Sequence, residues 1–118
     1  MDEFYARSVF FVRDAEHSLD FYTNTLGFTL DWNHREAGKA FVLQVSLFGF
    51  ELILNQVWDD TEVRAGHGRV FVGLDPGQRE RLQQHIKEKQ IETSTVNWGA
   101  PTLMIRDPDG NELFFSLK

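Results

Sequence analysis

The chain has 118 residues and a mass of 13.7 kDa, which suits one domain of ordinary size with its own hydrophobic core. Hydrophobic residues make up 42% of it, and no apolar run approaches the ~18 residues of a membrane span, so we expect neither disorder nor a membrane partner. The absence of cysteine excludes disulfides and thiolate metal sites, and it favours a cytoplasmic protein. The net charge of −6 argues against nucleic acid as a partner and permits a cationic ligand.

The first half of the chain predicts the order β-α-β-β-β. Residues 8–12 are β-branched and aromatic, as in a buried strand. Asp14 is a suitable N-cap for a helix that ends near Gly27, a typical residue after a helix C-terminus. Residues 28–33, 40–47 and 49–55 have the pattern of strands. The turns between them are predicted at Gly38 and at residues 48–49.

The second half repeats this pattern. Val70-Phe71-Val72 followed by Asp75 matches Val9-Phe10-Phe11 followed by Asp14 at an offset of 61, and residues 110–115 match 49–54 at the same offset. Pro76 and Gln78 predict a capped helix over 76–89, and strands are predicted at 93–98, 102–106 and 111–117. We therefore expect one domain over 1–118, with repeats at 5–57 and 68–118 and a linker at 58–67.

Two motifs point to a known family. The first is the segment 12–28, which begins Val12-Arg13-Asp14, and the second is Asp107-Pro108-Asp109-Gly110-Asn111. Together with the repeat they resemble the vicinal-oxygen-chelate superfamily, which includes glyoxalase I, extradiol dioxygenases and bleomycin-resistance proteins. The resemblance implies an α+β fold in which tandem β-α-β-β-β modules form a cup-shaped mixed sheet with helices outside. It also implies a homodimer with its site inside the cup.

The family's metal positions carry unsuitable residues in this chain. Metal-dependent members use His, Glu or Gln on the first and last strand of each module. The corresponding positions are Arg7, Glu51, Arg69 and Phe114. Guanidinium and phenyl groups donate no electron pair to a metal, so we expect no metal, no cofactor and no catalytic residue, and Glu51 and Glu112 should pair with Arg7 and Arg69. The alternative is a shifted metal site of Glu51, His67 and Glu112, which would need a β-bulge.

Aromatic residues suggest a ligand site instead. Trp98-Gly99 followed by Arg106-Asp107-Pro108 resembles a stretch of bleomycin-resistance proteins whose Trp stacks on planar rings of the drug, and Asp31-Trp32 matches an acidic-aromatic pair there. Such residues would bind a planar, cationic compound such as an antibiotic. The alternative is that these tryptophans simply pack in the core or at a strand edge. The candidate ligand-binding residues are Asp31, Trp32, Phe41, Glu51, Trp58, Trp98 and Phe114.

Three function classes stay open: a metal-independent binding protein, a glyoxalase, isomerase or dioxygenase with a displaced metal, and a dimeric accessory protein with a filled cup. Trp58 lies in an acidic linker and is a candidate lid or dimer contact. Phe41 is most simply a core residue, and His17, His34 and His85 are expected to be solvated. Unpaired arginines would instead favour an anionic ligand. Residues 4–8 lack the proline that helps bleomycin-resistance proteins exchange this arm, so exchange is an open question.

Overall fold

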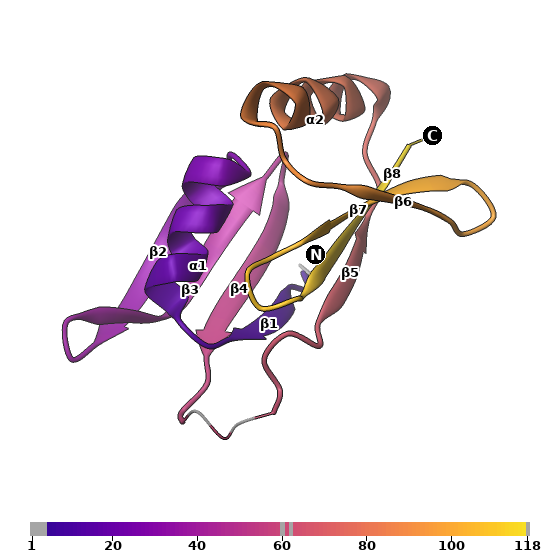
Figure 1. Cartoon of the computed structure of the whole chain (residues 1–118). Helices are drawn as coiled ribbons and strands as arrows, with labels where there is room; N and C mark the ends of the chain where they lie inside the picture. The colour runs from indigo at the N-terminus through magenta and orange to yellow at the C-terminus, as the bar shows by residue number, and fades with distance from the viewer. Residues whose placement is uncertain (1–4, 60, 62, 118) are drawn as a thin grey trace, which may run out of the picture.

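The computed structural model describes residues 5–59, 61 and 63–117, so Phe4 of the predicted arm, Asp60 of the linker and Lys118 lie outside the described residues. Within the described part of the chain, eight strands and three helical segments follow one another in the predicted order (Figure 1). They are β1 (Ser8–Val12), α1 (Ala15–Asp20), η1 (Phe21–Thr25), β2 (Thr29–Glu36), β3 (Lys39–Leu47), β4 (Phe50–Gln56), β5 (Arg69–Val72), α2 (Pro76–Lys89), β6 (Ser94–Asn97), β7 (Pro101–Arg106) and β8 (Glu112–Ser116). Over the described residues, no helix is both long and apolar enough to cross a membrane.

The strands form two mixed sheets with the same topology. The first sheet has the order β1-β4-β3-β2 and the second has the order β5-β8-β7-β6. In each sheet the first strand of the module runs parallel to its last strand, and the other neighbours are antiparallel. The α+β class and the tandem β-α-β-β-β modules are therefore confirmed, with one four-stranded sheet per module.

The strand register corrects the repeat offset at one place. Val9 pairs with Ile53, and Phe71 holds the equivalent place opposite Phe114. The first strands are thus related by 62 residues, and the predicted offset of 61 is wrong there. An additional residue, Arg13, stands between the first strand and its helix cap, and an offset of 61 relates the caps Asp14 and Asp75 and the last strands β4 and β8.

The helix boundaries follow from their caps. Asp14 accepts a hydrogen bond from the backbone N–H of His17 at 3.2 Å, and Asp75 and Gln78 form the predicted capping box. The predicted first helix changes at Phe21 into the π-helical segment η1, where hydrogen bonds span five residues. Gly27 follows with a φ of +83°, a left-handed conformation that glycine adopts without strain.

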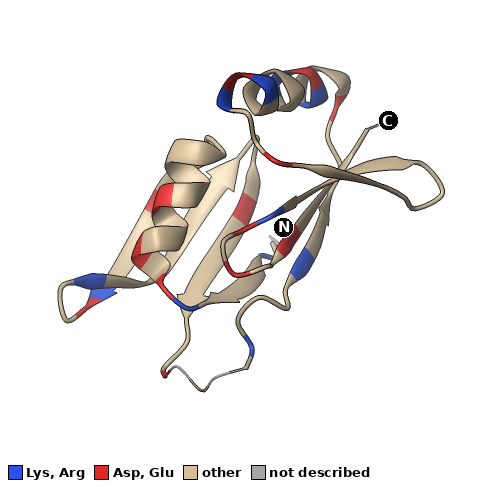
Figure 2. Ribbon diagram, viewed as in Figure 1, with Lys and Arg blue, Asp and Glu red and all other residues tan. Residues whose placement is uncertain are grey.

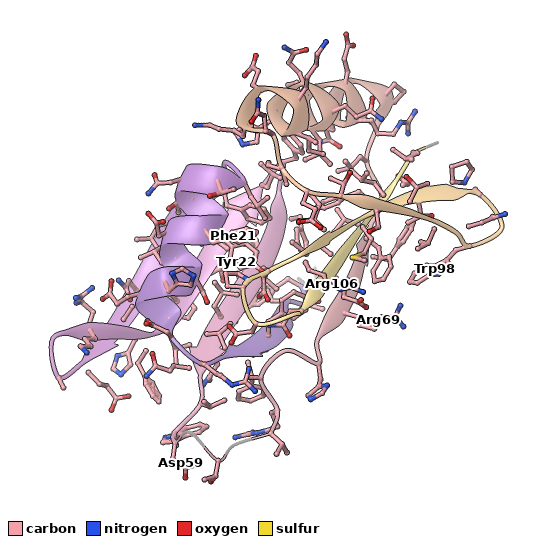
Figure 3. All side chains as sticks on the ribbon, in the orientation of Figure 1. Phe21, Tyr22, Asp59, Arg69, Trp98 and Arg106 are labelled. Carbon is pink, nitrogen blue, oxygen red and sulfur yellow. The ribbon has the colours of Figure 1, made fainter. Side chains whose placement is uncertain are left out.

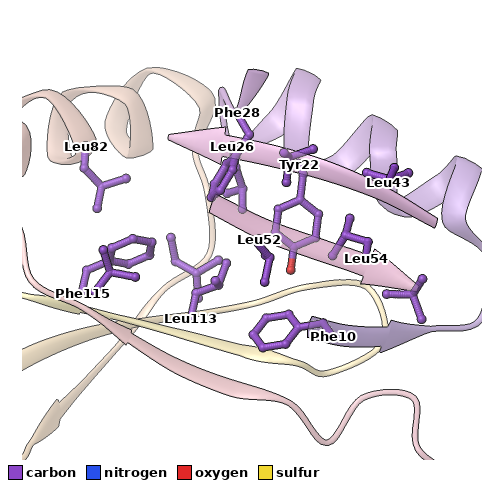
Figure 4. Close-up of a cluster of buried hydrophobic side chains, with 14 of the residues drawn as sticks. Phe10, Tyr22, Leu26, Phe28, Leu43, Leu52, Leu54, Leu82, Leu113 and Phe115 are labelled. Carbon is purple, nitrogen blue, oxygen red and sulfur yellow. The ribbon is translucent and has the colours of Figure 1, made fainter. Parts of the chain in front are cut away.

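One hydrophobic core joins the two modules. Tyr22, Leu52 and Leu54 come from the first module and Leu113 and Phe115 from the second, and all five are fully buried (Figure 4). Because side chains alternate along a strand, the residues between them lie on the opposite faces of the sheets. Those faces, which we call the open faces, carry exposed side chains such as Trp32 and Phe71 and most of the candidate ligand-binding residues; Phe41 and Trp58 lie beside the linker.

A buried polar network fastens the second module to the first. Tyr22 donates from its hydroxyl to Asp107 at 3.0 Å, and Asn111 donates to Asp107 at 2.9 Å and to the carbonyl of Phe11 at 3.0 Å. Burial raises the pKa of the Asp107 carboxyl above its usual value, although hydrogen bonds from Asn111 and Tyr22 oppose the shift. Burial, together with the charge of Asp107, raises the pKa of Tyr22 well above its usual value. The motif at 107–111 is therefore a docking element within this fold.

Candidate functional site

The open face of the first sheet carries a hydrogen-bonded group that we call the acidic cluster: Asp31, Trp32, Gln44 and Glu51. The side-chain amide of Gln44 donates to Asp31 at 2.9 Å and to Glu51 at 3.0 Å. Its oxygen accepts a hydrogen bond from the indole N–H of Trp32 at 3.2 Å. Trp32 remains 42% exposed, so its ring is available at the surface while its polar edge is fixed. The structure thus brings three of the predicted site residues together.

A bulge explains how the adjacent residues Asp31 and Trp32 both reach Gln44. Successive side chains on a regular strand point to opposite faces, but the register between β2 and β3 shifts between Leu30 and Trp32. Gln44 itself was not predicted. It is 3% exposed and lies between Leu43 and Val45, so the available signal was a single polar residue within a buried strand.

The open face of the second sheet carries an aromatic cluster of Phe71, Trp98 and Phe114. Trp98 stacks on Phe114 with 4.2 Å between ring centroids, and its centroid is 6.3 Å from that of Phe71. Trp98 is 49% exposed and Phe71 52% exposed, so neither is a core residue. Phe71 was not predicted, although its position in the β5 alternation placed it on this face.

Arginine–glutamate pairs occupy equivalent positions in the two modules, as predicted. Nε of Arg7 lies 3.3 Å from Oε1 of Glu51, and Nε of Arg69 lies 2.9 Å from Oε1 of Glu112. The hydrogen bond with Glu51 raises the pKa of Arg7. Arg106 also pairs with Glu112, at 3.1 Å, and Figure 3 labels Arg69, Arg106 and Trp98 on the second module.

The two open faces consequently differ in charge. On the first face, the carboxylates of Asp31 and Glu51 lie beside the guanidinium of Arg7, and a second guanidinium, that of Arg64, lies farther along β1, 4.0 Å from the ring centroid of Phe11. On the second face, two guanidinium groups share the one carboxylate of Glu112, and that of Arg69 lies 5.3 Å from the ring centroid of Trp98. Figure 2 shows acidic positions on α1 and mixed charges on α2, and the first repeat, residues 5–57, holds six acidic against four basic residues.

The residues at the family's metal positions do not fit a metal. Glu51 is bound to Arg7 and Gln44, and Glu112 is bound to Arg69 and Arg106. The register makes Glu112 the counterpart of Glu51, since Glu51 directly precedes Leu52 and Glu112 directly precedes the equivalent residue Leu113. Among the described residues, no three His, Cys, Asp or Glu side chains are grouped so that they could hold a metal. In particular, Glu51, His67 and Glu112 do not form such a group.

The remaining predicted residues form a third group beside the linker. Phe41 and Trp58 have ring centroids 5.6 Å apart, and Phe41 is half-buried, whereas Trp58 is 68% exposed. Arg64 lies 5.6 Å from the Trp58 ring centroid.

The histidine predictions need one correction. His17 and His34 are exposed, although His34 lies in β2 and not in a turn. His85 was predicted to be solvated but is half-buried, because its Nε2 donates to the carbonyl of Thr25 at 2.7 Å and its ring packs over Gly27.

Comparison with known proteins supports the same fold. The bleomycin-binding protein from Streptomyces verticillus, solved with copper(II)-bleomycin, superimposes with a TM-score of 0.74 at 19% identity over 100% of this chain and 99% of that one. TnmS3, an antibiotic-binding protein from Streptomyces sp. CB03234, gives 0.64 at 24% identity over 98% of both chains. Lactoylglutathione lyase from Agrobacterium tumefaciens gives 0.67 at 15% identity over 97% of this chain and 92% of that one.

Sequence comparison decides the family. No curated protein matches the sequence significantly. The sequence profile of the Glyoxalase/Bleomycin resistance protein/Dioxygenase superfamily, however, matches residues 5–115. That match spans both modules and includes both open faces. The chain therefore belongs to the glyoxalase/bleomycin resistance protein/dioxygenase superfamily.

Proposed function

We propose that this protein is a metal-independent binding protein that sequesters a planar, cationic small molecule such as an antibiotic. The observation that carries the proposal is the acidic cluster, in which an exposed indole ring is fixed beside two carboxylates. An aromatic face attracts a cation and stacks on a planar ring, and nearby carboxylates add Coulomb attraction. The binding of bleomycin and of an antibiotic by the two Streptomyces proteins of the same fold is consistent with this function.

The charge difference between the open faces directs the cation to the first sheet. A cationic ring stacked on Trp32 meets Asp31 and Glu51, whereas one stacked on Trp98 meets the guanidinium of Arg69. An anionic group of the same ligand would find its partners on the second sheet, near Arg69 and Arg106. Asp31, Trp32 and Glu51 are thus the proposed primary site, and Trp98, which stacks on the buried Phe114, is a secondary stacking surface.

A second copy of the chain would complete the site. Val9, Trp32, Phe71 and Trp98 are 42–52% exposed on the open faces, which is unusual for large apolar residues of a monomer. The excess of carboxylates on one face and of guanidinium groups on the other suits contact between the first sheet of one copy and the second sheet of its partner. We therefore propose a homodimer with Trp58 at the rim of the site. We also propose a cytoplasmic location, because the chain contains no cysteine.

Fluorescence titration tests the binding site. We expect proflavine, a planar cation, and bleomycin to quench tryptophan emission. Trp32→Phe should remove most of the quenching by proflavine, and Asp31→Asn should weaken binding about tenfold, since a desolvated charged contact contributes about 1.5–3 kcal/mol. Trp98→Phe is the matched control and should reduce proflavine binding less. No quenching by either compound, or equal losses in all three variants, would refute the proposed site.

Metal analysis separates this function from the enzyme alternative. Protein purified without chelator should hold less than one equivalent of transition metal, and proflavine binding should survive dialysis against chelator. A full equivalent of metal that is lost on His67→Ala would favour the displaced metal centre instead.

Light scattering tests the proposed dimer. It should give twice the mass of the chain for the native protein, and Val9→Glu should reduce the measured mass to that of a monomer. A monomeric native protein would contradict the proposed dimer.

A further inference from the structure

A cavity lies on the helical side of the molecule, away from both open faces. It has a volume of about 210 Å³ and lies where the end of η1, the turn between β3 and β4 and the helix α2 meet. Its lining residues are Leu26, Gly27, Leu47, Phe48, Arg81, Leu82 and His85. Figure 4 shows Leu82 pointing from α2 toward the core cluster that contains Leu26. None of these residues belongs to the proposed cation site.

The backbone around this cavity is strained at one residue. Phe48 has a φ of +54° and Gly49 a φ of +87°, so both adopt left-handed conformations in the turn. Glycine does so freely, whereas a bulky residue such as Phe pays about 1–2 kcal/mol. A turn with no other role would favour Asn-Gly at these positions. Strain that persists in this way is typical of functional positions, and here it places the ring of Phe48 at the wall of the cavity.

The polar groups of the cavity favour an anion. The Arg81 guanidinium lies 4.8 Å from the ring centroid of Phe48, and no carboxylate among the described residues is within ion-pairing distance of it. His85 is fixed by its hydrogen bond to Thr25, and its ring approaches Gly27 so closely that an added Cβ would lie 3.2 Å from Cε1. No acidic residue lines the cavity.

The other walls are aliphatic. Leu26, Leu47 and Leu82 surround the interior, so a ligand needs an apolar body as well as a negative charge. The volume of about 210 Å³ is below the ~300–1,000 Å³ of drug-sized sites, which limits the ligand to a small molecule. We propose that this cavity binds a small monocarboxylate with an apolar chain, its carboxylate paired with Arg81 and its chain among the three leucines.

Octanoate is a suitable probe, observed by amide chemical shifts in the isotope-labelled full-length protein. We expect saturable shifts at Gly27, Phe48 and His85. Octanol, which keeps the chain but lacks the charge, should bind at least about tenfold more weakly, as should octylamine, because one charge-assisted contact is worth about that factor. Acetate, which keeps the charge but lacks the chain, should give no saturable shifts at these amides.

Three variants test the assignment of roles. Arg81→Gln should weaken octanoate binding about tenfold, while Lys89→Gln, on the same helix and outside the lining, should leave it unchanged. Phe48→Asn replaces the ring with a residue that tolerates the left-handed conformation of the turn. This variant should therefore fold normally and bind octanoate more weakly. Leu47→Phe should fill the cavity and abolish binding.

Several results would overturn the proposal. They are an absence of shifts at these amides with millimolar octanoate, equal binding of octanol and octanoate, and equal losses in Arg81→Gln and Lys89→Gln. Retention of octanoate binding by Leu47→Phe would place the ligand elsewhere. The proflavine titration is a separate measurement on the opposite side of the sheet, so either proposal can fail without the other.

Discussion

The buried hydrogen bond between Tyr22 and Asp107 gives the sharpest test of how the two modules are held together. Tyr22 is 0% exposed and donates to a carboxylate that is itself 5% exposed, at 3.0 Å. Tyr22→Phe removes the donor and leaves the ring packing intact. Asn111 continues to donate to the same carboxylate, so the group loses one partner and not all of them.

The expected cost follows from the charge of the acceptor. Hydrogen bonds to charged groups contribute about 1.5–3 kcal/mol, and we expect the unfolding free energy of Tyr22→Phe to fall by that amount near pH 7. For a chain of 118 residues this corresponds to a Tm lower by about 6–12 °C, at roughly 4 °C per kcal/mol. The loss should be smaller near pH 4, because a protonated Asp107 gains less from the donor.

Urea unfolding followed by tryptophan fluorescence, at one fixed protein concentration, measures these changes. Tyr5→Phe is the matched control, because Tyr5 is 71% exposed, so removal of its hydroxyl should change the unfolding free energy little. If Tyr22→Phe costs no more than this control, or costs the same at both pH values, then the hydrogen bond does not stabilise an ionised Asp107 and the reasoning fails.

Three further predictions concern stability. Asp107→Asn removes a carboxyl whose pKa is raised by burial in the folded protein. The folded native protein therefore binds more protons at this site than the unfolded chain, so its unfolding free energy should fall relative to that of the variant as pH rises above about 4, the usual carboxyl pKa, in urea unfolding over a pH series. Gly68→Ala should cost about 1–3 kcal/mol in urea unfolding, because its Cβ would lie 2.4 Å from Cδ1 of Phe10, whereas Gly73→Ala, with nothing within 4 Å, should change stability by less than about 0.5 kcal/mol. Glu112→Gln should lower the unfolding free energy by less than about 1 kcal/mol, because the arginines that it pairs with are largely solvated; a larger loss would show that this pair is structural.

Short-range signals were sufficient to predict the element order. Asp14 and the Asp75-Pro76 pair specify their helices through hydrogen bonds to residues three positions away, so they can be recognised in sequence. The pairing of Arg7 with Glu51 was also predicted, because the family resemblance assigned these two residues to facing positions on the first and last strands of the module. The change to π-helix at Phe21 has no comparable signal, since it depends on hydrogen bonds one residue longer than those of an α-helix.

Long-range contacts account for most of what the sequence could not predict. Tyr22 and Asp107 are 85 residues apart, and nothing local to either shows that they meet. The exposure of Trp98 was equally uncertain, because a strand alternates between two faces and only the packing of the modules decides which face is buried. Asp31 and Trp32 reach the same partner only through a bulge, which shifts the register by an amount that composition does not specify.

The difference between the two open faces originates at one repeated position. Gln44 pairs with Ile53 in the first sheet, and Met104 holds the equivalent place opposite Phe114 in the second; both side chains are almost fully buried. An amide at this position can bind two carboxylates and an indole N–H at once, and so it gathers the acidic cluster. A thioether offers no donor, so that the equivalent surface is held by ring stacking and by the arginines around Glu112. The same backbone repeat thus carries an acidic cluster on one face and an aromatic cluster with two arginines on the other, and the buried side chain at this one position, an amide or a thioether, distinguishes them.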